Sequence, residues 1–279
     1  MLDPDQIVWA ADRLRTAERT GTPIGPLVTA LPGIDAEDAY RIQLLNIRRR
    51  TERDGADGSP VVGHKVGLSS RAMQEMMGVD EPDYGHLLAD MRLDADVPAR
   101  RDRYLWPRVE PEVGFVLGAD LPGEGCTEAD VLAATEAVAP AIEVIDSRIA
   151  DWQIRLPDTI ADNASSAGFV LGEQRLDPNE IDLTGIGVRL WRNQEEVAAG
   201  RSDAVLGNPV IAVAWLARTV ARFGVRLRAG HLVLPGSCTR AIDARAGDDF
   251  QAEFDGLGVV RLAFQEARKT PKEKAGAHG

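Results

Sequence analysis

The sequence predicts an α+β fold in which a strand-rich region with a mixed β-sheet follows a helical N-terminal segment. Two patterns predict this fold: apolar residues recur at helical spacing in the first 60 residues, and short β-branched or alternating segments recur in the rest of the chain. With 279 residues, of which 44% are hydrophobic and 27% charged, the chain is long enough to bury a substantial core. We expect a helical lead-in over residues 1–60, a strand-rich domain over residues 61–265 and a flexible tail over residues 266–279.

Two helices are predicted in the N-terminal segment, the second of which begins near Asp35. The apolar residues expected on one face are Val8, Ala11 and Leu14 in the first helix and Tyr40, Leu44 and Ile47 in the second.

Two more helices are predicted within the strand-rich region. Thr127 and Asp130 have the spacing of a capping box, in which each side chain bonds a free backbone N–H of the first turn, and the apolar residues that follow extend the predicted helix over residues 131–139. A second apolar run, over residues 210–223, predicts a helix that ends at Gly224.

The predicted strands are short and are bounded by glycine or polar turns. They comprise the segments RVEPEVGFVLG, GVRLWRN, HLVLPGS and GVVRLAF.

Composition excludes several classes of protein. A formal net charge of −12 argues against nucleic acid as a partner, because binding to phosphates requires clustered Lys and Arg. Cys126 and Cys238 provide neither a disulfide framework nor the spacing of a zinc site. The acidic N-terminus does not resemble a signal peptide, and we find no apolar run close to the roughly 20 residues of a membrane span. We therefore expect a cytoplasmic protein without a membrane partner.

Two glutamates lie close together on one predicted strand. Glu110 and Glu112 are two residues apart, so their side chains should point to the same face. Such a pair is tolerated when it is solvated, when one carboxyl is protonated or when a cation lies between them. A solvated strand edge is one interpretation, and Pro111 between the two favours it because proline is confined to edges and bulges.

A third glutamate favours the cation. Glu143 lies within the apolar segment AIEVI, where a strand would carry its side chain into or beside the core. A buried unpaired glutamate costs several kcal/mol unless a positive charge accompanies it. Oxygen ligands without a nearby Cys or His select a hard cation, so the three glutamates predict a site for Mg²⁺ or Mn²⁺.

Five ordered segments of the sequence resemble the 2-keto-4-pentenoate hydratase family, which belongs to the fumarylacetoacetate hydrolase superfamily. These segments are GHKVGLSS, PDYGHL, RVEPEVGFVL, AIEVIDSRIADWQI and DTIADNASSAGFVLG. The resemblance extends from about the first helix to Phe264. It implies a mixed β-sheet roll or barrel of the fumarylacetoacetate hydrolase C-terminal type, with residues 61–265 as the catalytic domain.

The resemblance also implies roles for individual residues. It assigns the metal to Glu110, Glu112 and Glu143, in agreement with the spacing argument, and it places Lys65 and Asp83 beside the substrate. We assign Asp83 as proton carrier and water activator and Lys65 as the group that stabilises an enolate or relays a proton, although these two roles could be exchanged. In unrelated sequences such residues would be an ordinary strand-edge cation and a turn aspartate.

Three further residues are implied to contact substrate: Asp162, Ser166 and Ser237. For the polar run at 162–166 the simpler interpretation is a capped turn. His64 and His86 flank the proposed catalytic residues, but a lone histidine is more often a hydrogen-bonded structural residue, so we do not count them as catalytic.

The activity implied is a lyase that adds water to 2-hydroxypenta- or 2-hydroxyhexa-2,4-dienoate to give a 4-hydroxy-2-oxo acid, in aromatic or steroid catabolism. Three alternatives remain: a decarboxylase of a 2-oxo-hex-3-enedioate that uses the same metal site, a C–C bond hydrolase, and a non-catalytic partner subunit. The resemblance further implies a homo-oligomer and association with neighbouring pathway enzymes.

Overall fold

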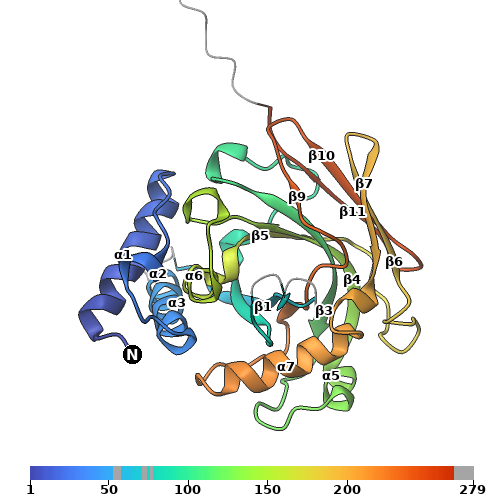
Figure 1. Ribbon diagram of the computed structural model, residues 1–279. Helices are drawn as coiled ribbons and strands as arrows, with labels where there is room; N and C mark the ends of the chain where they lie inside the picture. The colour runs from blue at the N-terminus through green and yellow to red at the C-terminus, as the bar shows by residue number, and fades with distance from the viewer. Residues whose placement is uncertain (53–57, 71–73, 76–77, 267–279) are drawn as a thin grey trace, which may run out of the picture.

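The computed structural model describes residues 1–52, 58–70, 74–75 and 78–266, and most of the predicted tail lies outside them. Three helices precede the first strand, and two β-sheets with interspersed helices form the rest of the described chain (Figure 1). This arrangement confirms the predicted α+β class with a mixed sheet. The helices are α1 (Pro4–Thr20), α2 (Leu27–Ala30), α3 (Ala36–Thr51), α5 (Glu128–Ala134), α6 (Leu156–Ala161) and α7 (Pro209–Ala221).

The first helix forms where local signals favour it. Asp3 caps α1 by accepting from Gln6 N, and the helix ends at Thr20, before Gly21, which adopts a left-handed φ of 65°. The predicted apolar face is partly wrong, because Val8 is 41% exposed. The face that packs on α3 comprises Ile7, Ala10, Ala11, Leu14 and Ala17.

The third helix connects the N-terminal segment to the sheet. Asp35 caps α3, and Tyr40 and Ile47 are buried as predicted, while Leu44 is only partly buried. Gln43 is almost completely buried and donates hydrogen bonds to the carbonyl oxygens of Tyr84 and Ile160, at 2.9 and 2.8 Å. These bonds satisfy the NH2 group of a buried amide and fix α3 against the elements that carry the site.

The larger sheet has seven strands in the order β2-β1-β8-β3-β4-β5, with β9 paired to β3. Only β1 and β8 run parallel among its described pairs. Its strands are β1 (Val61–Gly67), β2 (Asp83–Leu88), β3 (Arg108–Leu117), β4 (Thr135–Ile145), β5 (Ser166–Leu171), β8 (Leu232–Leu234) and β9 (Ile242–Asp243).

The smaller sheet has four antiparallel strands in the order β11-β10-β6-β7, and its strand β11 packs beside β4 (Figure 1). Its strands are β6 (Gly187–Arg192), β7 (Glu195–Arg201), β10 (Asp249–Phe254) and β11 (Gly258–Ala263). The predicted strands near residues 108, 187, 231 and 258 are therefore all present.

Pro111 lies inside the larger sheet, although proline indicated an edge. On the side of β3 that faces β8 and β9, these two strands pair only with residues 115–116 and 108–109 and leave Pro111 without a strand partner. The Pro111 carbonyl accepts a hydrogen bond from Cys238 N there, at 3.0 Å. The N–H that proline lacks would point to this same side, so the sheet loses no ladder bond there.

The helix predicted over residues 131–139 is wrong in its second half. The capping box of Thr127 and Asp130 is present, but α5 ends at Ala134 and β4 starts at Thr135. Pro140 explains the change, because its ring clashes with a helical carbonyl four residues earlier and disfavours helix at residue 139.

The predicted helix near residue 210 is confirmed, and Gly224 follows its end with a φ of 72°. Contrary to the sequence-based expectation, the 20-residue stretch Ser202–Ala221 has the length and mean hydropathy, 1.5, of a membrane span. Half of the most apolar part of this stretch is buried within the protein, and α7 contributes residues such as Val213 and Leu216 to the main hydrophobic core. This burial is typical of a core helix.

Candidate metal centre and active site

The three predicted metal ligands meet on the adjacent strands β3 and β4. Glu110 and Glu143 lie directly opposite one another in the antiparallel register, and Glu112 follows two residues along on the same face. One carboxylate oxygen from each glutamate lies within 4.8 Å of the others. Residues 33 positions apart are thus brought together by strand pairing.

The three carboxyls are in an unfavourable environment when no cation is bound. Glu112 and Glu143 are fully buried and Glu110 is partly buried. Burial raises the pKa of Glu110 to about 7, with Lys65 opposing the shift and Glu143 adding to it. Burial and then repulsion by Glu143 raise the pKa of Glu112 well above its usual range. Burial likewise raises the pKa of Glu143, although Lys65 opposes it.

The unpaired oxygens of this cluster fit a divalent cation. Glu112 Oε2 accepts from Gly236 N at 2.7 Å, and Glu143 Oε1 accepts from Ser166 Oγ at 2.7 Å. The second oxygens, Glu112 Oε1 and Glu143 Oε2, are buried without a hydrogen-bond partner among the described residues. Glu112 and Glu143 are therefore each oriented by one hydrogen bond, and the second oxygen of each is available to a hard cation.

Lys65 lies beside this cluster on β1. Its Nζ donates to the carbonyl oxygen of Ala164 at 3.0 Å and lies 3.4 Å from Glu143 Oε2. Burial acts to lower the pKa of Lys65, but the charge of Glu143, followed by that of Asp83, more than offsets it and raises the pKa. The ammonium is consequently charged at neutral pH.

Asp83 begins β2 and pairs with Gly67 at the end of β1. Both of its carboxylate oxygens are buried without a hydrogen-bond partner in the described part of the chain. Burial raises the pKa of Asp83, and the charge of Lys65 opposes the shift. A Cβ on Gly67 would lie 2.2 Å from Asp83 Oδ1 and 3.3 Å from Lys65 Nζ, so glycine leaves the space in which both groups meet.

A short loop, residues 162–166, contains the carbonyl that Lys65 contacts and the hydroxyl that Glu143 contacts. Its residues Asn163, Ala164 and Ser165 have φ values of 57°, 49° and 56°, which non-glycine residues rarely adopt. This conformation directs the Ala164 carbonyl to Lys65 and the Ser166 hydroxyl to Glu143. The side chain of Asn163 holds the loop on β2, since it bonds both the N–H and the carbonyl of His86 at 2.8 and 3.0 Å.

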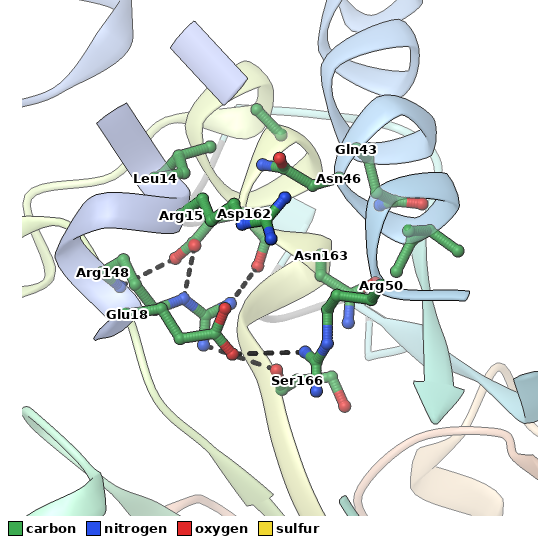
Figure 2. Close-up of a pocket in the computed structure, with 12 residues that line it drawn as sticks. Leu14, Arg15, Glu18, Gln43, Asn46, Arg50, Arg148, Asp162, Asn163 and Ser166 are labelled. Atoms are coloured by element: carbon green, nitrogen blue, oxygen red, sulfur yellow. Dashed lines mark hydrogen bonds and ion pairs between the residues drawn. The ribbon is translucent and has the colours of Figure 1, made fainter. Parts of the chain in front are cut away.

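Arg148 stabilises this loop from the other side. Figure 2 shows its guanidinium pointing toward Asp162, at a pocket bordered by α1, α3 and the loop. Arg148 donates from its backbone N to Asp162 Oδ2 at 2.8 Å and from Nε to Asp162 Oδ1 at 2.5 Å. Its Nη2 and Nη1 donate to the carbonyl oxygens of Asp162 and Ser166. Burial acts to lower the pKa of Arg148, and the Asp162 charge more than offsets this effect and raises the pKa.

The predicted substrate-contact residues thus differ in their surroundings. Ser166 contacts a metal-ligand candidate directly, whereas both oxygens of Asp162 already accept bonds from Arg148. Ser237 is partly exposed and follows Gly236, whose N–H bonds Glu112. The sequence did not identify Arg148 or Gly236 as site residues. A cation in an apolar segment could have indicated Arg148, but the sequence does not show that its partner is Asp162, 14 residues further along the chain.

His64 and His86 lie on the opposite face of the sheet from this site. His64 precedes Lys65 on β1, His86 lies three residues after Asp83 on β2, and the two histidines pair directly across the strands. Because successive side chains alternate between faces, they point away from Lys65. The His–carboxylate pair that a C–C hydrolase would require is absent from the described surroundings of the glutamates.

Comparison with known proteins gives consistent matches. The family model described as "Fumarylacetoacetate (FAA) hydrolase C-terminal" matches residues 86–265. The chain is 43% identical over 264 residues to 2-keto-4-pentenoate hydratase of Paraburkholderia xenovorans, covering 95% of this chain and 97% of that protein. It is 40% identical over 268 residues to 2-hydroxyhexa-2,4-dienoate hydratase of Comamonas testosteroni, covering 95% and 100%.

A solved structure resembles the whole fold. The 4-oxalocrotonate decarboxylase of Pseudomonas putida G7, complexed with magnesium and adipate, superposes with a TM-score of 0.89 at 36% identity and covers 95% of this chain and 99% of its own. The complex of that decarboxylase with calcium and acetate superposes on this chain with the same TM-score, 0.89.

Proposed function

Because this chain belongs to the fumarylacetoacetate hydrolase family, we propose that it is a hydro-lyase that adds water to a 2-hydroxy-2,4-dienoate and produces a 4-hydroxy-2-oxo acid. The dienoate would have five or six carbons. The observation that carries the proposal is the cluster of Glu110, Glu112 and Glu143 with Lys65 3.4 Å from Glu143. The similarity to hydratases over 95% of the chain supports this chemistry over the alternatives.

The cofactor we propose is Mg²⁺ or Mn²⁺, held by the three glutamates. Their hard oxygen ligands favour such an ion, and its placement is supported by one oxygen each of Glu112 and Glu143 that takes part in no hydrogen bond among the described residues. When bound, the ion would supply Lewis-acid stabilisation of negative charge on the substrate carboxylate and 2-oxygen. The similar decarboxylase was solved with magnesium, which supports the choice of ion class.

The residues of the chain would manage the protons. The reaction requires loss of the 2-hydroxyl proton, protonation of the far end of the diene, and addition of water to the conjugated carbon of the resulting enone. Lys65, charged and fixed between Ala164 O and Glu143, would stabilise negative charge on the substrate. Asp83, with a raised pKa and two unpaired oxygens, would carry the proton and activate water.

Ser166 and Ser237 are proposed to border the substrate, and the position of Ser166 beside Glu143 supports this role for Ser166. Asp162 would act through its bonds with Arg148, as part of the loop that positions Ser166 and Lys65. A cytoplasmic homo-oligomer active in aromatic or steroid catabolism completes the proposal, and the resemblance to hydratases supports it.

The test uses the purified full chain with Mg²⁺ and 2-hydroxypenta-2,4-dienoate. The proposal predicts enzyme-dependent loss of the dienoate ultraviolet absorbance and formation of the 4-hydroxy-2-oxo acid, and an absorbance decay at the spontaneous rate would reject it. Release of CO₂ from 2-oxo-hex-3-enedioate, without hydration of the dienoate, would instead identify a decarboxylase.

A further inference from the structure

A second cluster of ionisable groups lies on the face of the larger sheet that is opposite the glutamates. His64 and His86 face one another across β1 and β2, with ring centroids 4.8 Å apart. His231, just before β8, lies 5.7 Å from His64 by the same measure. None of these residues has a part in the proposed reaction.

The two inner histidines are buried, and their hydrogen-bonding capacity is largely unused. His64 is 0% exposed and His86 2% exposed. Both ring nitrogens of His64, and Nδ1 of His86, have no hydrogen-bond partner among the described residues. A neutral imidazole carries one donor and one acceptor, and leaving them unpaired in the interior is unfavourable. Burial, followed by the neighbouring histidines, keeps the pKa of His64 below its usual range, so the ring is neutral.

These histidines line a cavity of about 430 Å³ between α3, β1, β2 and the segment that follows α7. Three arginines also line it: Arg48 from α3, and Arg226 and Arg228 from the segment before β8. None of the three forms an ion pair with a carboxylate in the part of the chain that the structure describes. We call this cavity, with its three arginines and three histidines, the Arg–His pocket.

The charge balance of the Arg–His pocket is unusual in this chain. The whole sequence has a formal net charge of −12, yet three exposed arginines line this one pocket. Asp120 accepts from Ala229 N at 2.8 Å, and its charge acts on His231. The walls include Leu44, Ile47, Val61, Phe223 and Val225. Guanidinium groups bind carboxylates and phosphates through paired N–H donors, and apolar walls accommodate a carbon skeleton.

We propose that the Arg–His pocket binds a small organic oxyanion, with its charged end among Arg48, Arg226 and Arg228. The polar groups of the ligand supply the partners that the buried imidazoles lack. A carboxylate or a phosphate ester fits this chemistry. The site is distinct from the glutamate cluster, because His64 and His86 point to the face of the larger sheet opposite Lys65 and the glutamates, and its existence does not depend on the hydratase proposal.

The experiment titrates the full chain with citrate and, separately, with inorganic phosphate at constant ionic strength. Binding is followed by calorimetry and by NMR of the imidazole C–H signals. The chain has four histidines, of which His64, His86 and His231 line the Arg–His pocket and His278 lies outside the described residues. The proposal predicts saturable shifts of the three pocket signals with one common dissociation constant. The tighter of the two probes identifies the oxyanion as carboxylate or phosphate.

Variants separate this site from non-specific and active-site binding. The double substitution Arg226→Gln with Arg228→Gln should weaken binding by about tenfold or more, because charged hydrogen bonds are lost. Arg261→Gln, on β11 of the other sheet, removes a similar charge and should leave the affinity unchanged. Glu112→Gln should also bind normally.

Three results would overturn the proposal: no saturable binding of either probe, equal weakening by Arg261→Gln, or pocket signals that respond to protein concentration and not to anion. The last result would show that a second copy of the chain covers the pocket.

Discussion

Replacing Arg148 by methionine is expected to destabilise the protein and to misplace the groups around Lys65. Arg148 is 7% exposed and Asp162 is 3% exposed, so the substitution leaves a carboxylate buried without its positive partner. Removing one partner of a buried ion pair costs about 3–5 kcal/mol. It also removes the side-chain bonds to the carbonyls of Asp162 and Ser166, which help to hold the left-handed residues 163–165 in place.

The effect on catalysis follows from what the loop presents. If the loop relaxes, the Ala164 carbonyl moves from Lys65 and the Ser166 hydroxyl moves from Glu143. A displacement of about 1 Å at a reacting site can cost about 100-fold in rate. We therefore expect kcat for dienoate hydration to fall by about 100-fold in Arg148→Met, with partial recovery in Arg148→Lys, which restores the charge but not the paired donors.

The assays are urea unfolding at fixed protein concentration and steady-state kinetics in the presence of Mg²⁺. Arg100→Met is the matched control, because the Arg100–Asp102 pair is exposed and solvent screens its attraction. A double-mutant cycle with Asp162→Asn isolates the coupling between the two partners. An unfolding free energy and a kcat for Arg148→Met that equal those of Arg100→Met would refute this reasoning.

Three other predictions concern the same site. Gly85→Ala should lower the free energy of unfolding by about 1–3 kcal/mol and reduce activity, because the new Cβ would lie 2.3 Å from Asn163 O and displace the 162–166 loop from β2. An unchanged melting temperature would contradict this contact. Asp83→Asn should lower kcat by about 10²–10⁴-fold at an unchanged metal affinity, and a variant that retains the parent pH–rate profile would remove Asp83 from proton transfer. The metal-free protein should lose stability as pH rises. Folding raises the pKa of Glu110 from 4.5 to about 7. The stability that protonated Glu110 contributes is therefore fully present below the pKa of the unfolded chain and is lost as the pH rises through the pKa of the folded one. Melting curves of the metal-free parent and Glu110→Gln across this range test the sign, and parallel curves would contradict it.

Much of the glutamate site could be predicted from local pattern. The period of two along a strand places Glu110 and Glu112 on one face, and an isolated carboxylate among apolar residues indicates that Glu143 is buried. The exact opposition of Glu110 and Glu143 depends on the register of β3 and β4, which sequence spacing alone does not specify.

Other features depend on tertiary contacts that no local pattern encodes. The bond between Arg148 and Asp162 requires a left-handed loop, and nothing in the polar run 162–166 distinguishes that loop from an ordinary capped turn. Residues 135–139 favour helix locally, but pairing with β3 and the proline at 140 make them a strand. The Arg–His pocket combines α3, two strands and the segment after α7, so it emerges only from the fold.

The central claim is that three glutamates from two strands bind one divalent cation. Calorimetric titration of the metal-free chain with Mn²⁺, followed by competition with Mg²⁺, measures this binding directly. The account predicts one site per chain that is lost in Glu143→Gln and retained in Glu136→Gln, which alters an exposed glutamate of the same strand. Equal affinity in these two variants would contradict the account.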